Sequence, residues 1–379
     1  MSKYYSNKRI RETGASYYMI VGERSNGKTY SSLYTGLEKY FKDGSQIAYI
    51  RRWDEDIRGK RGQQVFDSLV YNGEIKKLSK GEWDSVYYYS GRWYLTKVKK
   101  DGTVIKDIKP FAFAFSLNGM EHDKSTSYPG VKTIIFDEFL TRGRGLGDDE
   151  FLLFMNVLST IIRDPSRTDI EIFMLANTVN WDSVYFKEFG LTNVRTMKQG
   201  TIETYTYGNS KCTLALEYCE SRKTKESQLN DRYFAFDNPG LKMITEGAWE
   251  MDIWPHLPIK YKPENIVFSY FIQYNDETLQ ADIIQGGYIY DKELRKETVD
   301  DNAYFTYIHQ KTTPIKNEDD DLIFTNSYSA KPNQRLNMFK PSDNIGKNIL
   351  KFFKDNKVFY QDNITGEIVN NYKEWCLSV

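Results

Sequence analysis

The segment from Gly22 to Thr29 has the residue types and the spacing of a phosphate-binding loop. It reads GERSNGKT and fits the pattern G-x-x-x-x-G-K-[ST] at every position. Glycines let such a loop wrap phosphate oxygens with its backbone amides, and the helix that follows directs its positive end at them. Lys28 would then reach the β- and γ-phosphates of a nucleotide, and Thr29 would hold Mg²⁺. The predicted nucleotide-binding residues are Gly22, Arg24, Ser25, Asn26, Gly27, Lys28 and Thr29.

Two adjacent acids, Asp137 and Glu138, supply the second part of such a site. They follow the run VKTIIF, whose apolar residues predict a buried strand. An acid at the end of a strand beside the loop strand can order the Mg²⁺ shell, so Asp137 is predicted as a metal ligand together with Thr29. Glu138 is predicted as the base that polarises the attacking water. The competing interpretation is a strand that ends in two solvated acids.

Asn177 and an arginine could complete a hydrolytic site. Asn177 ends the strand-like run DIEIFMLAN and is predicted to sense the γ-phosphate, although an ordinary turn at the end of a strand explains it equally well. An arginine that neutralises the transferred phosphoryl group can come from a neighbouring subunit. Arg163 is the favoured candidate for this finger, and Arg167, Arg142 and Arg144 compete with it.

A cluster of cations follows Arg51 and Arg52, where Arg58, Lys60 and Arg61 stand close together. Cations on a loop can grip the phosphates of DNA without reading its bases. These last three are the predicted DNA-binding residues, and a solvated loop with three acids nearby is the alternative. The chain carries 52 basic and 52 acidic residues, and this balance excludes a broad electrostatic footprint.

Length and composition limit the class of protein. A chain of 379 residues is too long for one ordinary core and predicts two domains. Three scattered cysteines fit neither a disulfide framework nor a zinc site, which indicates a reducing compartment. No apolar run approaches the ~20 residues of a membrane span, so we expect a soluble intracellular protein.

The candidate residues must be positioned by a sheet. Strand-like runs at 16–21, 46–50, 131–136 and 169–176 alternate with helix-like segments at 29–40, 65–78 and 148–163. An aromatic hairpin is expected over 86–115. The alternation predicts an α/β fold with a wound parallel sheet. Strand-like runs recur after residue 263, so we expect a P-loop domain at 1–220, a linker at 221–258 and a smaller strand-rich domain at 259–379.

The chain resembles the genome-packaging ATPases of small protein-primed podophages, the picovirus group. The resemblance rests on ordered landmarks over roughly residues 15–190: GERSNGKT, a strand ending AYIRR, YPGVKTIIFDEF, IIRDPSR and LAN. It implies an ASCE-type P-loop ATPase domain and an RNase H-like C-terminal domain. It also implies a ring motor, a homopentamer that binds ATP and Mg²⁺ between subunits and drives double-stranded DNA into a prohead.

The resemblance also implies roles for single residues. The family's active-site residues match Lys28, Asp137, Glu138 and Asn177. Arg163 matches the arginine finger that acts in trans, and Lys124 matches a lysine that acts near the neighbouring site. Asp54 stands where the family has a basic residue, so DNA contact would move to Arg58, Lys60 or Arg61. The implied partners are the phage portal and prohead in the host cytoplasm, and a structural RNA stays an open partner.

The last third of the chain shows little sign of nuclease chemistry. Two-metal cleavage of DNA needs several carboxylates from neighbouring strands. The run IVFSYFIQY carries none, and Asp276, Asp282 and Asp291 lie at strand ends or in the next strand. We therefore expect a vestigial nuclease fold that binds nucleic acid.

These observations together favour ATP-driven translocation of double-stranded viral DNA. The alternatives are another P-loop DNA pump or assembly ATPase, and a non-enzymatic nucleic-acid-binding protein with a degenerate nucleotide site. A switch GTPase would need an N-K-x-D motif, which the chain lacks.

Overall fold

The chain folds into two compact units, Met1–Glu250 and Met251–Val379. The computed structural model describes residues 5–119, 127–141, 146–147, 149–164, 166–208, 212–220, 254–256, 261–291 and 296–378. The predicted linker at 221–258 lies almost entirely outside the described residues, and the domain limits remain predictions.

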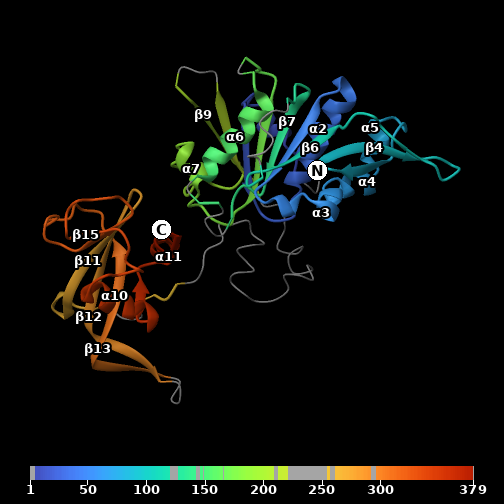
Figure 1. The fold of residues 1–379 in the computed structure, drawn as a ribbon. Helices are drawn as coiled ribbons and strands as arrows, with labels where there is room; N and C mark the ends of the chain where they lie inside the picture. The colour runs from blue at the N-terminus through green and yellow to red at the C-terminus, as the bar shows by residue number, and fades with distance from the viewer. Residues whose placement is uncertain are drawn as a thin grey trace. The chain divides into compact units, whose positions relative to one another are not determined.

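A ten-stranded sheet forms the centre of the first unit (Figure 1). Its strands are β1 (Tyr17–Gly22), β2 (Gln46–Arg51), β3 (Ser85–Tyr89), β4 (Arg92–Val98), β5 (Val104–Lys106), β6 (Ala112–Ser116), β7 (Val131–Asp137), β8 (Glu171–Asn177), β9 (Thr201–Thr206) and β10 (Thr213–Tyr218). They lie in the order β3-β4-β6-β2-β7-β8-β1-β10-β9, and β5 pairs with β4 outside this path. The central run from β6 to β10 is parallel, and antiparallel strands flank it at both ends.

The residues of β1 show why this sheet is covered on both faces. Met19 and Val21 belong to one buried cluster, while Tyr18 and Ile20 belong to another. Successive side chains of a strand point to opposite faces, so an apolar run such as YYMIV needs cover on each. Helices α6 (Glu150–Ile162) and α7 (Val184–Glu188) pack in the first cluster, and α2 (Lys28–Asp43) packs in the second.

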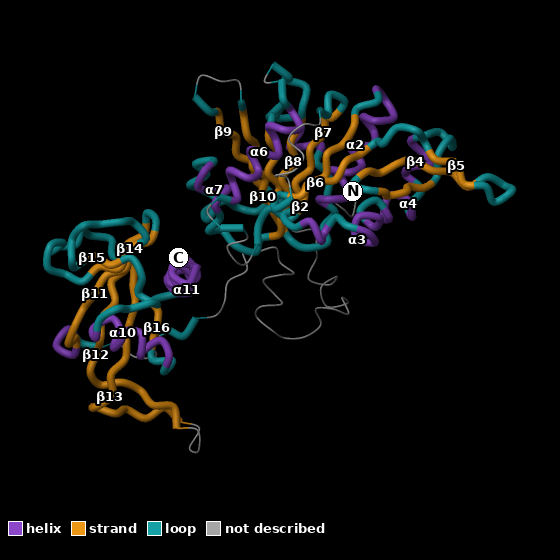
Figure 2. Tube along the Cα trace, viewed as in Figure 1, coloured by secondary structure: helices purple, strands orange, loops and turns teal. Residues whose placement is uncertain are grey.

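Shorter helices complete the first unit (Figure 2). They are α1 (Lys8–Arg11), the 3₁₀ helix η1 (Asp54–Asp56), α3 (Gly59–Gln64), α4 (Asp67–Tyr71) and α5 (Glu74–Leu78). The predicted helix at 65–78 is wrong in extent, because Gly73 takes a φ of +72° and separates α4 from α5. The predicted α/β fold with its wound parallel sheet is confirmed, although β9 and β10 have no counterpart among the predicted strands.

A six-stranded sheet forms the second unit, in the order β15-β14-β11-β12-β13-β16. Its elements are η3 (Pro263–Asn265), β11 (Ile266–Tyr274), β12 (Glu277–Asp291), β13 (Lys296–Gln310), β14 (Ile323–Thr325), β15 (Gln334–Arg335), α10 (Asn344–Lys354), β16 (Val358–Tyr360) and α11 (Asn363–Ser378). β11, β12 and β13 are antiparallel, and β14 is parallel to β11. This confirms the smaller strand-rich domain, and its strand order agrees with the RNase H-like arrangement that the resemblance implies.

Within the described residues, none of the helices combines the length and the apolar character needed to cross a bilayer.

Candidate functional site

The order of the strands brings the predicted site residues to one edge of the sheet. β8 lies between β1 and β7, so the ends of three parallel strands are adjacent. Gly22, the last residue of β1, pairs with Asn177, and Asp137 pairs with Leu175. The P-loop, the acid pair and Asn177 therefore meet at the carboxyl edge, where wound α/β sheets bind their ligands.

The loop between β1 and α2 has the backbone of a phosphate cradle. Ser25 and Gly27 take positive φ values of 59° and 99°, and Gly27 caps the N-terminus of α2. A left-handed residue turns the chain sharply, so successive amides can face one anion. Gly22 has no space for a side chain, because a Cβ there would lie 2.7 Å from the Cβ of Cys219. Arg24 is an exposed residue of the same loop.

Lys28 lies inside this loop. Its Nζ donates to the carbonyl oxygens of Gly22 at 3.2 Å and Glu23 at 2.7 Å, and to Asn26 Oδ1 at 3.2 Å. The same nitrogen is 3.4 Å from Asn177 Oδ1. Burial lowers the pKa of Lys28, since a low-dielectric surrounding disfavours the charged form. Phosphate oxygens could replace these neutral acceptors and would offset that cost by their negative charge.

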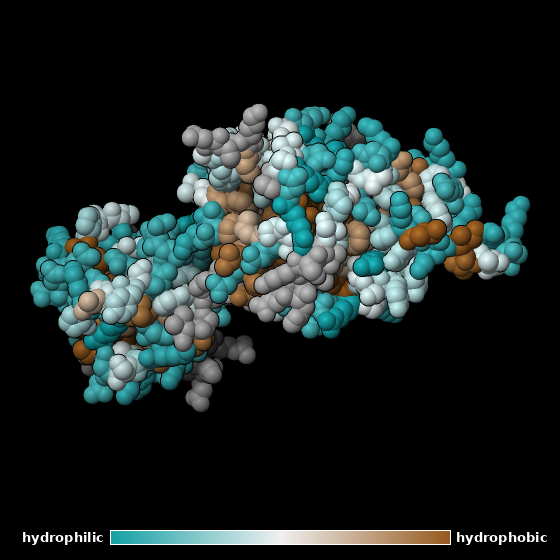
Figure 3. Space-filling view, turned by 45° about the horizontal axis from the view of Figure 1, so that its top comes forward, coloured by the Kyte–Doolittle hydropathy of each residue, from teal (hydrophilic) through white to brown (hydrophobic). Residues whose placement is uncertain are grey.

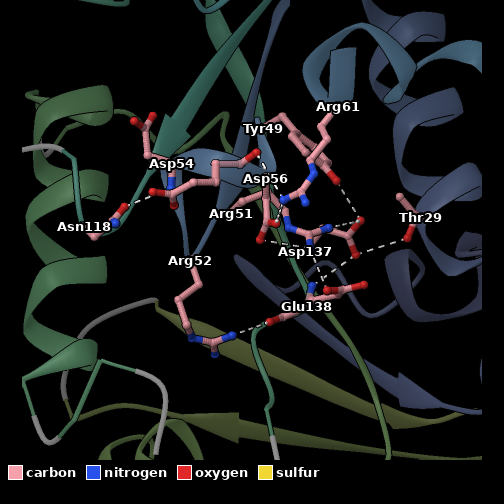
Figure 4. A network of polar contacts seen from close by, with 11 residues as sticks. Thr29, Tyr49, Arg51, Arg52, Asp54, Asp56, Arg61, Asn118, Asp137 and Glu138 are labelled. Carbon is pink, nitrogen blue, oxygen red and sulfur yellow. Dashed lines mark hydrogen bonds and ion pairs between the residues drawn. The ribbon is translucent and has the colours of Figure 1, made fainter. Parts of the chain in front are cut away.

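Asp137 is buried, and donors occupy both of its carboxylate oxygens (Figure 4). Oδ1 accepts from Thr29 Oγ1 at 3.1 Å, and Oδ2 accepts from the Tyr49 hydroxyl at 2.9 Å. Burial raises the pKa of Asp137, while the Arg51 guanidinium and the Tyr49 hydrogen bond oppose that shift. Hydroxyl and carboxylate oxygens are the hard ligands that Mg²⁺ prefers, with waters and substrate phosphates filling the other positions. The Thr29–Asp137 pair therefore fits the predicted Mg²⁺ site.

Glu138 follows β7 in a left-handed turn, with a φ of +59°. Its Oε2 accepts from Arg51 Nη2 at 2.6 Å. The same guanidinium is 3.4 Å from Asp56 Oδ2 and 4.0 Å from Asp137 Oδ2. Burial alone would lower the pKa of Arg51, but Tyr49 and the two site acids outweigh it and raise the pKa, so the guanidinium stays charged. Arg51, the last residue of β2, thus holds the carboxylate of Glu138, the predicted base.

Arg52 fixes the turn that carries Glu138. It donates to both carboxylate oxygens of Glu150, at 2.9 Å and 2.8 Å, and to the carbonyl oxygens of Glu138 at 3.1 Å and Phe139 at 2.6 Å. The Tyr185 hydroxyl also donates to Glu150, at 2.9 Å. A buried bidentate pair of this kind is directional and costly to break on one side. The Arg52–Glu150 pair therefore fixes the turn at Glu138 and Phe139 relative to the first residue of α6.

Arg163 and Arg167 lie away from the nucleotide edge of their own sheet. α6 begins at Glu150, beside the turn that Arg52 holds, and ends at Ile162, directly before the exposed Arg163. Arg167 donates to the carbonyl oxygen of Val131 at the start of β7, and it pairs with Asp169 at 3.6 Å. Arg163 therefore lies at the opposite end of α6 from the turn that carries Glu138. The remaining candidates Lys124, Arg142 and Arg144 lie outside the described residues.

The predicted DNA-binding residues Arg58, Lys60 and Arg61 are exposed and follow β2 at the nucleotide edge. The predicted loop is partly wrong, because Arg58 caps the start of α3 while Lys60 and Arg61 lie in that helix; we call the three residues the cation loop. Arg58 pairs with Asp54, and Arg61 pairs with Asp56 at 3.2 Å. Asp56 also contacts the guanidinium of Arg51, which in turn pairs with Glu138. A chain of ion pairs therefore links the cation loop to the acid pair of the nucleotide site (Figure 4).

In the second unit, Asp282 is a buried carboxylate with polar contacts to both of its oxygens. It accepts from Ser269 Oγ at 2.6 Å, Gln280 Nε2 at 2.9 Å and the Tyr261 hydroxyl at 3.1 Å, and it lies 3.1 Å from His309 Nε2. Four such contacts occupy the lone pairs of both oxygens. Among the described residues, no group of three or more His, Cys, Asp and Glu side chains could hold a metal ion.

Tyr49 and Glu150 form part of the site but were not predicted from the sequence, and Arg51 and Arg52 were predicted only as members of a basic segment. One signal was available, because alternation along AYIRR puts Tyr49 and Arg51 on the same side of their strand. The contacts themselves depend on the pairing of β2 with β7, which no local pattern reveals.

Comparison with known proteins places the chain among phage packaging proteins. The DNA packaging protein of Bacillus phage B103 is 29% identical over 174 residues, which are 45% of this chain and 47% of that protein. The DNA packaging protein of Bacillus phage phi29 is 24% identical over 192 residues, 50% of this chain and 51% of that protein. The chain thus matches about half the length of these curated relatives.

Solved structures of low sequence identity share the fold over the whole chain. The viral genome packaging motor assembly of bacteriophage Phi-29 has a TM-score of 0.55 at 17% identity, with 100% of this chain and 99% of that chain covered. The Phi-28 gp11 DNA packaging motor has a TM-score of 0.51 at 16% identity, with the same coverage. The Podovirus DNA encapsidation protein (Gp16) family matches residues 1–283, and the chain, with its P-loop, acid pair and strand order, belongs to that family.

Proposed function

We propose that this chain hydrolyses ATP where β1, β8 and β7 end, and that it uses the energy to move double-stranded viral DNA into a prohead. The observation that carries the proposal is the position of β8 between β1 and β7. This strand order puts Asn177 beside Lys28, and the hydroxyl of Thr29 donates a hydrogen bond to Asp137. Membership of a DNA encapsidation family supports DNA as the cargo.

In this proposal the loop amides and Lys28 bind the β- and γ-phosphates. Mg²⁺, when bound with ATP, neutralises charge on the phosphates, and Thr29 and Asp137 hold it. Asn177 contacts the γ-phosphate from β8. Glu138 orients the attacking water and accepts its proton.

Glu138 can do this only after Arg51 releases it. A carboxylate oxygen that accepts from a guanidinium at 2.6 Å is engaged with that donor and is less free to accept the proton of an attacking water. Arg51 also contacts Asp56, which pairs with Arg61 of the cation loop. DNA phosphates that draw Arg61 away would disturb this chain of ion pairs, which provides a physical route from DNA binding to hydrolysis.

The proposed assembly is a homo-oligomeric ring, a pentamer by resemblance, docked on the portal of the prohead in the host cytoplasm. Arg163 would act in trans on the nucleotide of a neighbouring subunit, with Lys124 near the same site. The position of Arg163 at the far end of α6 supports this assignment.

Separate measurements of nucleotide binding and hydrolysis test the proposed site. Lys28→Ala should lose tight ATP binding and hydrolysis together, because the phosphates lose the ammonium group of Lys28 in the P-loop. Glu138→Gln should bind Mg·ATP normally and turn over about 100-fold more slowly or worse, because an amide cannot accept the proton. Glu188→Gln, at an exposed acid of α7, is the control. Turnover by Glu138→Gln at the unaltered rate would remove Glu138 from the proposed role.

A further inference from the structure

A groove on the second unit lies among α10, α11, β16 and the segment that leads into the unit, and we call it the α10–α11 groove. Its volume is about 510 Å³, and its lining includes Trp254, Leu350, Phe353, Val358 and Tyr360. Binding pockets usually measure ~300–1,000 Å³ and are mostly apolar with a few polar groups. Val358 and Tyr360 are each 5% exposed and form the base of the groove. None of these residues belongs to the nucleotide site or the cation loop, so the groove is a separate feature of the chain.

Several contacts hold Trp254 against β16 and α11. Its backbone amide donates to Asn363 Oδ1 at 3.1 Å, and the carbonyl oxygen of Pro255 accepts from the Tyr360 amide at 2.8 Å. The indole ring packs directly on the backbone of α11, because a Cβ at Gly366 would collide with it. The groove is therefore preformed, and a preformed surface binds a partner at a lower entropic cost.

Apolar side chains along the groove are incompletely covered. On α10, Ile349 is 2% exposed and packs into the unit, while Leu350 and Phe353 are half-buried and share the neighbouring face of the helix. Leu377, in the last turn of α11, is 52% exposed. The face of the second unit that Figure 3 shows is mostly hydrophilic, with small apolar patches. On such a surface, an apolar groove with polar residues around it marks an interaction site.

The charge of the groove indicates the chemistry of its partner. Both charged residues that line it are exposed lysines, Lys354 and Lys373, and the acidic residue that follows each of them in the sequence does not line it. Lys347 and Lys351 extend the positive charge along α10, which contains no acidic residue. Within the part of the chain that the structure describes, none of these four lysines pairs with a carboxylate. The groove therefore complements a partner that is both apolar and acidic.

The aromatic rings of the groove are arranged for packing and not for stacking on bases. Trp254 packs against Tyr360 at an interplanar angle of 67°, and Phe339 packs against Phe353 at 72°. Proteins that hold single-stranded nucleic acid present rings on which successive bases stack. A nucleic acid would thus match the lysines of the groove but not its apolar lining.

We propose that the α10–α11 groove binds an amphipathic helix of a protein partner, with apolar side chains on one face of that helix and carboxylates beside them. The apolar side chains would contact Leu350, Phe353 and Val369, as in other complexes in which a helix lies in an apolar groove. The carboxylates would pair with Lys354 and Lys373. This proposal stands apart from ATP hydrolysis, because the groove shares no residue with the nucleotide site.

Fluorescence anisotropy of the full chain without nucleotide tests the proposal. The probe is a labelled peptide of about sixteen residues, long enough to form a helix, with leucine and glutamate at helical spacing. This glutamate peptide should bind about tenfold more tightly than a lysine peptide, which has the same pattern with lysine in place of glutamate. The reason is that the lysines of the groove attract the first peptide and repel the second.

Reversal of the two lining charges tests the position of the site. Lys354→Glu combined with Lys373→Glu should invert the preference, so that the lysine peptide binds more tightly, and a misfolded variant could not gain affinity in this way. Leu377→Ser, at an exposed apolar residue of the groove, should weaken binding of the glutamate peptide without inverting the preference. The control, Lys76→Glu combined with Lys80→Glu at exposed lysines of the first unit, should bind both peptides as the unaltered chain does.

Three outcomes would overturn the proposal. The first is equal affinity of the two peptides for the unaltered chain, or a preference that survives the charge reversal. The second is labelled oligothymidine that binds more tightly than the glutamate peptide and loses this affinity in the charge-reversal variant, which would assign the lysines to a nucleic acid. The third is self-association of the chain, measured by sedimentation velocity, that disappears in the same variant, which would make a second copy of the chain the occupant of the groove.

Discussion

The hydroxyl of Tyr49 illustrates how a single buried donor can shape the proposed Mg²⁺ site. It donates to Asp137 Oδ2 at 2.9 Å, while the ring packs edge-on against Trp93 with centroids 6.0 Å apart. Phenylalanine would keep the ring contact and remove only the donor. The freed oxygen of Asp137 would then be less well oriented in a site closed to solvent.

Tyr49→Phe should raise the Mg²⁺ concentration that gives half-maximal ATP hydrolysis by about tenfold, the magnitude expected for a lost hydrogen bond to a charged group. The maximal rate at saturating Mg²⁺ should change less. Mg²⁺ titrations of initial rates measure both quantities. Tyr18→Phe, at a buried tyrosine of β1 that packs on Phe173, is the control for loss of a hydroxyl. Identical Mg²⁺ titrations for Tyr49→Phe and the unaltered chain would contradict the positioning role.

Arg51 has a different predicted effect, because it restrains the base rather than the metal ligand. Arg51→Gln frees Glu138 from the contact at 2.6 Å and cuts the chain of ion pairs to Asp56. The ratio of DNA-stimulated to basal hydrolysis should fall several-fold, mainly because basal hydrolysis rises. Arg51→Lys, which keeps the charge, should retain more of the stimulation. A ratio that stays the same in Arg51→Gln would show that the contact does not regulate the base.

Helices and strands could be predicted from the sequence where an apolar run lies next to a recognisable motif. The apolar run before Gly22 and the run before Asp137 predicted β1 and β7, and the loop motif predicted the start of α2. The same patterns could not predict which strands pair, so the contact of Arg52 with Glu150, 98 positions along the chain, stayed invisible. Short helices such as α4 and α5 were merged, since a single glycine decides their boundary.

The cation loop is the element whose role can be tested by charge. Alanine at Arg58, Lys60 and Arg61 together should reduce the slope of log affinity against log salt for duplex DNA, because fewer counterions are released. DNA-stimulated hydrolysis should fall while basal hydrolysis remains. Alanine at Lys76, Lys77 and Lys80, three exposed lysines at the end of α5, removes equal charge elsewhere. A slope unchanged in the loop variant, or reduced equally in both, would place the DNA contact elsewhere.

At the scale of the whole molecule, a nucleotide site at one end of α6 and an exposed arginine at the other suit head-to-tail subunit contacts. Such contacts close into rings when the rotation allows it. A subunit in a ring would then offer Arg163 to one neighbour and its P-loop to the other.

Mixed rings test this arrangement. Arg163→Ala subunits and Glu138→Gln subunits are each expected to be inactive alone, with losses of about 10³-fold for the finger. Mixed together they should recover part of the activity, because some interfaces combine an intact base with an intact finger. Native mass measurement must first confirm mixed assemblies. Confirmed mixing without any recovery of hydrolysis would rule out Arg163 as the finger.

We propose above that one site, built from β1, β8 and β7, couples ATP hydrolysis to duplex DNA. The most direct measurement is the steady-state rate of ATP hydrolysis by the purified chain with and without duplex DNA, for the unaltered protein and for Glu138→Gln. We expect hydrolysis by the unaltered chain, stimulation by DNA of any sequence, and neither in Glu138→Gln, which should still bind ATP. Hydrolysis that ignores DNA, or DNA-stimulated hydrolysis that survives in Glu138→Gln, would contradict this account.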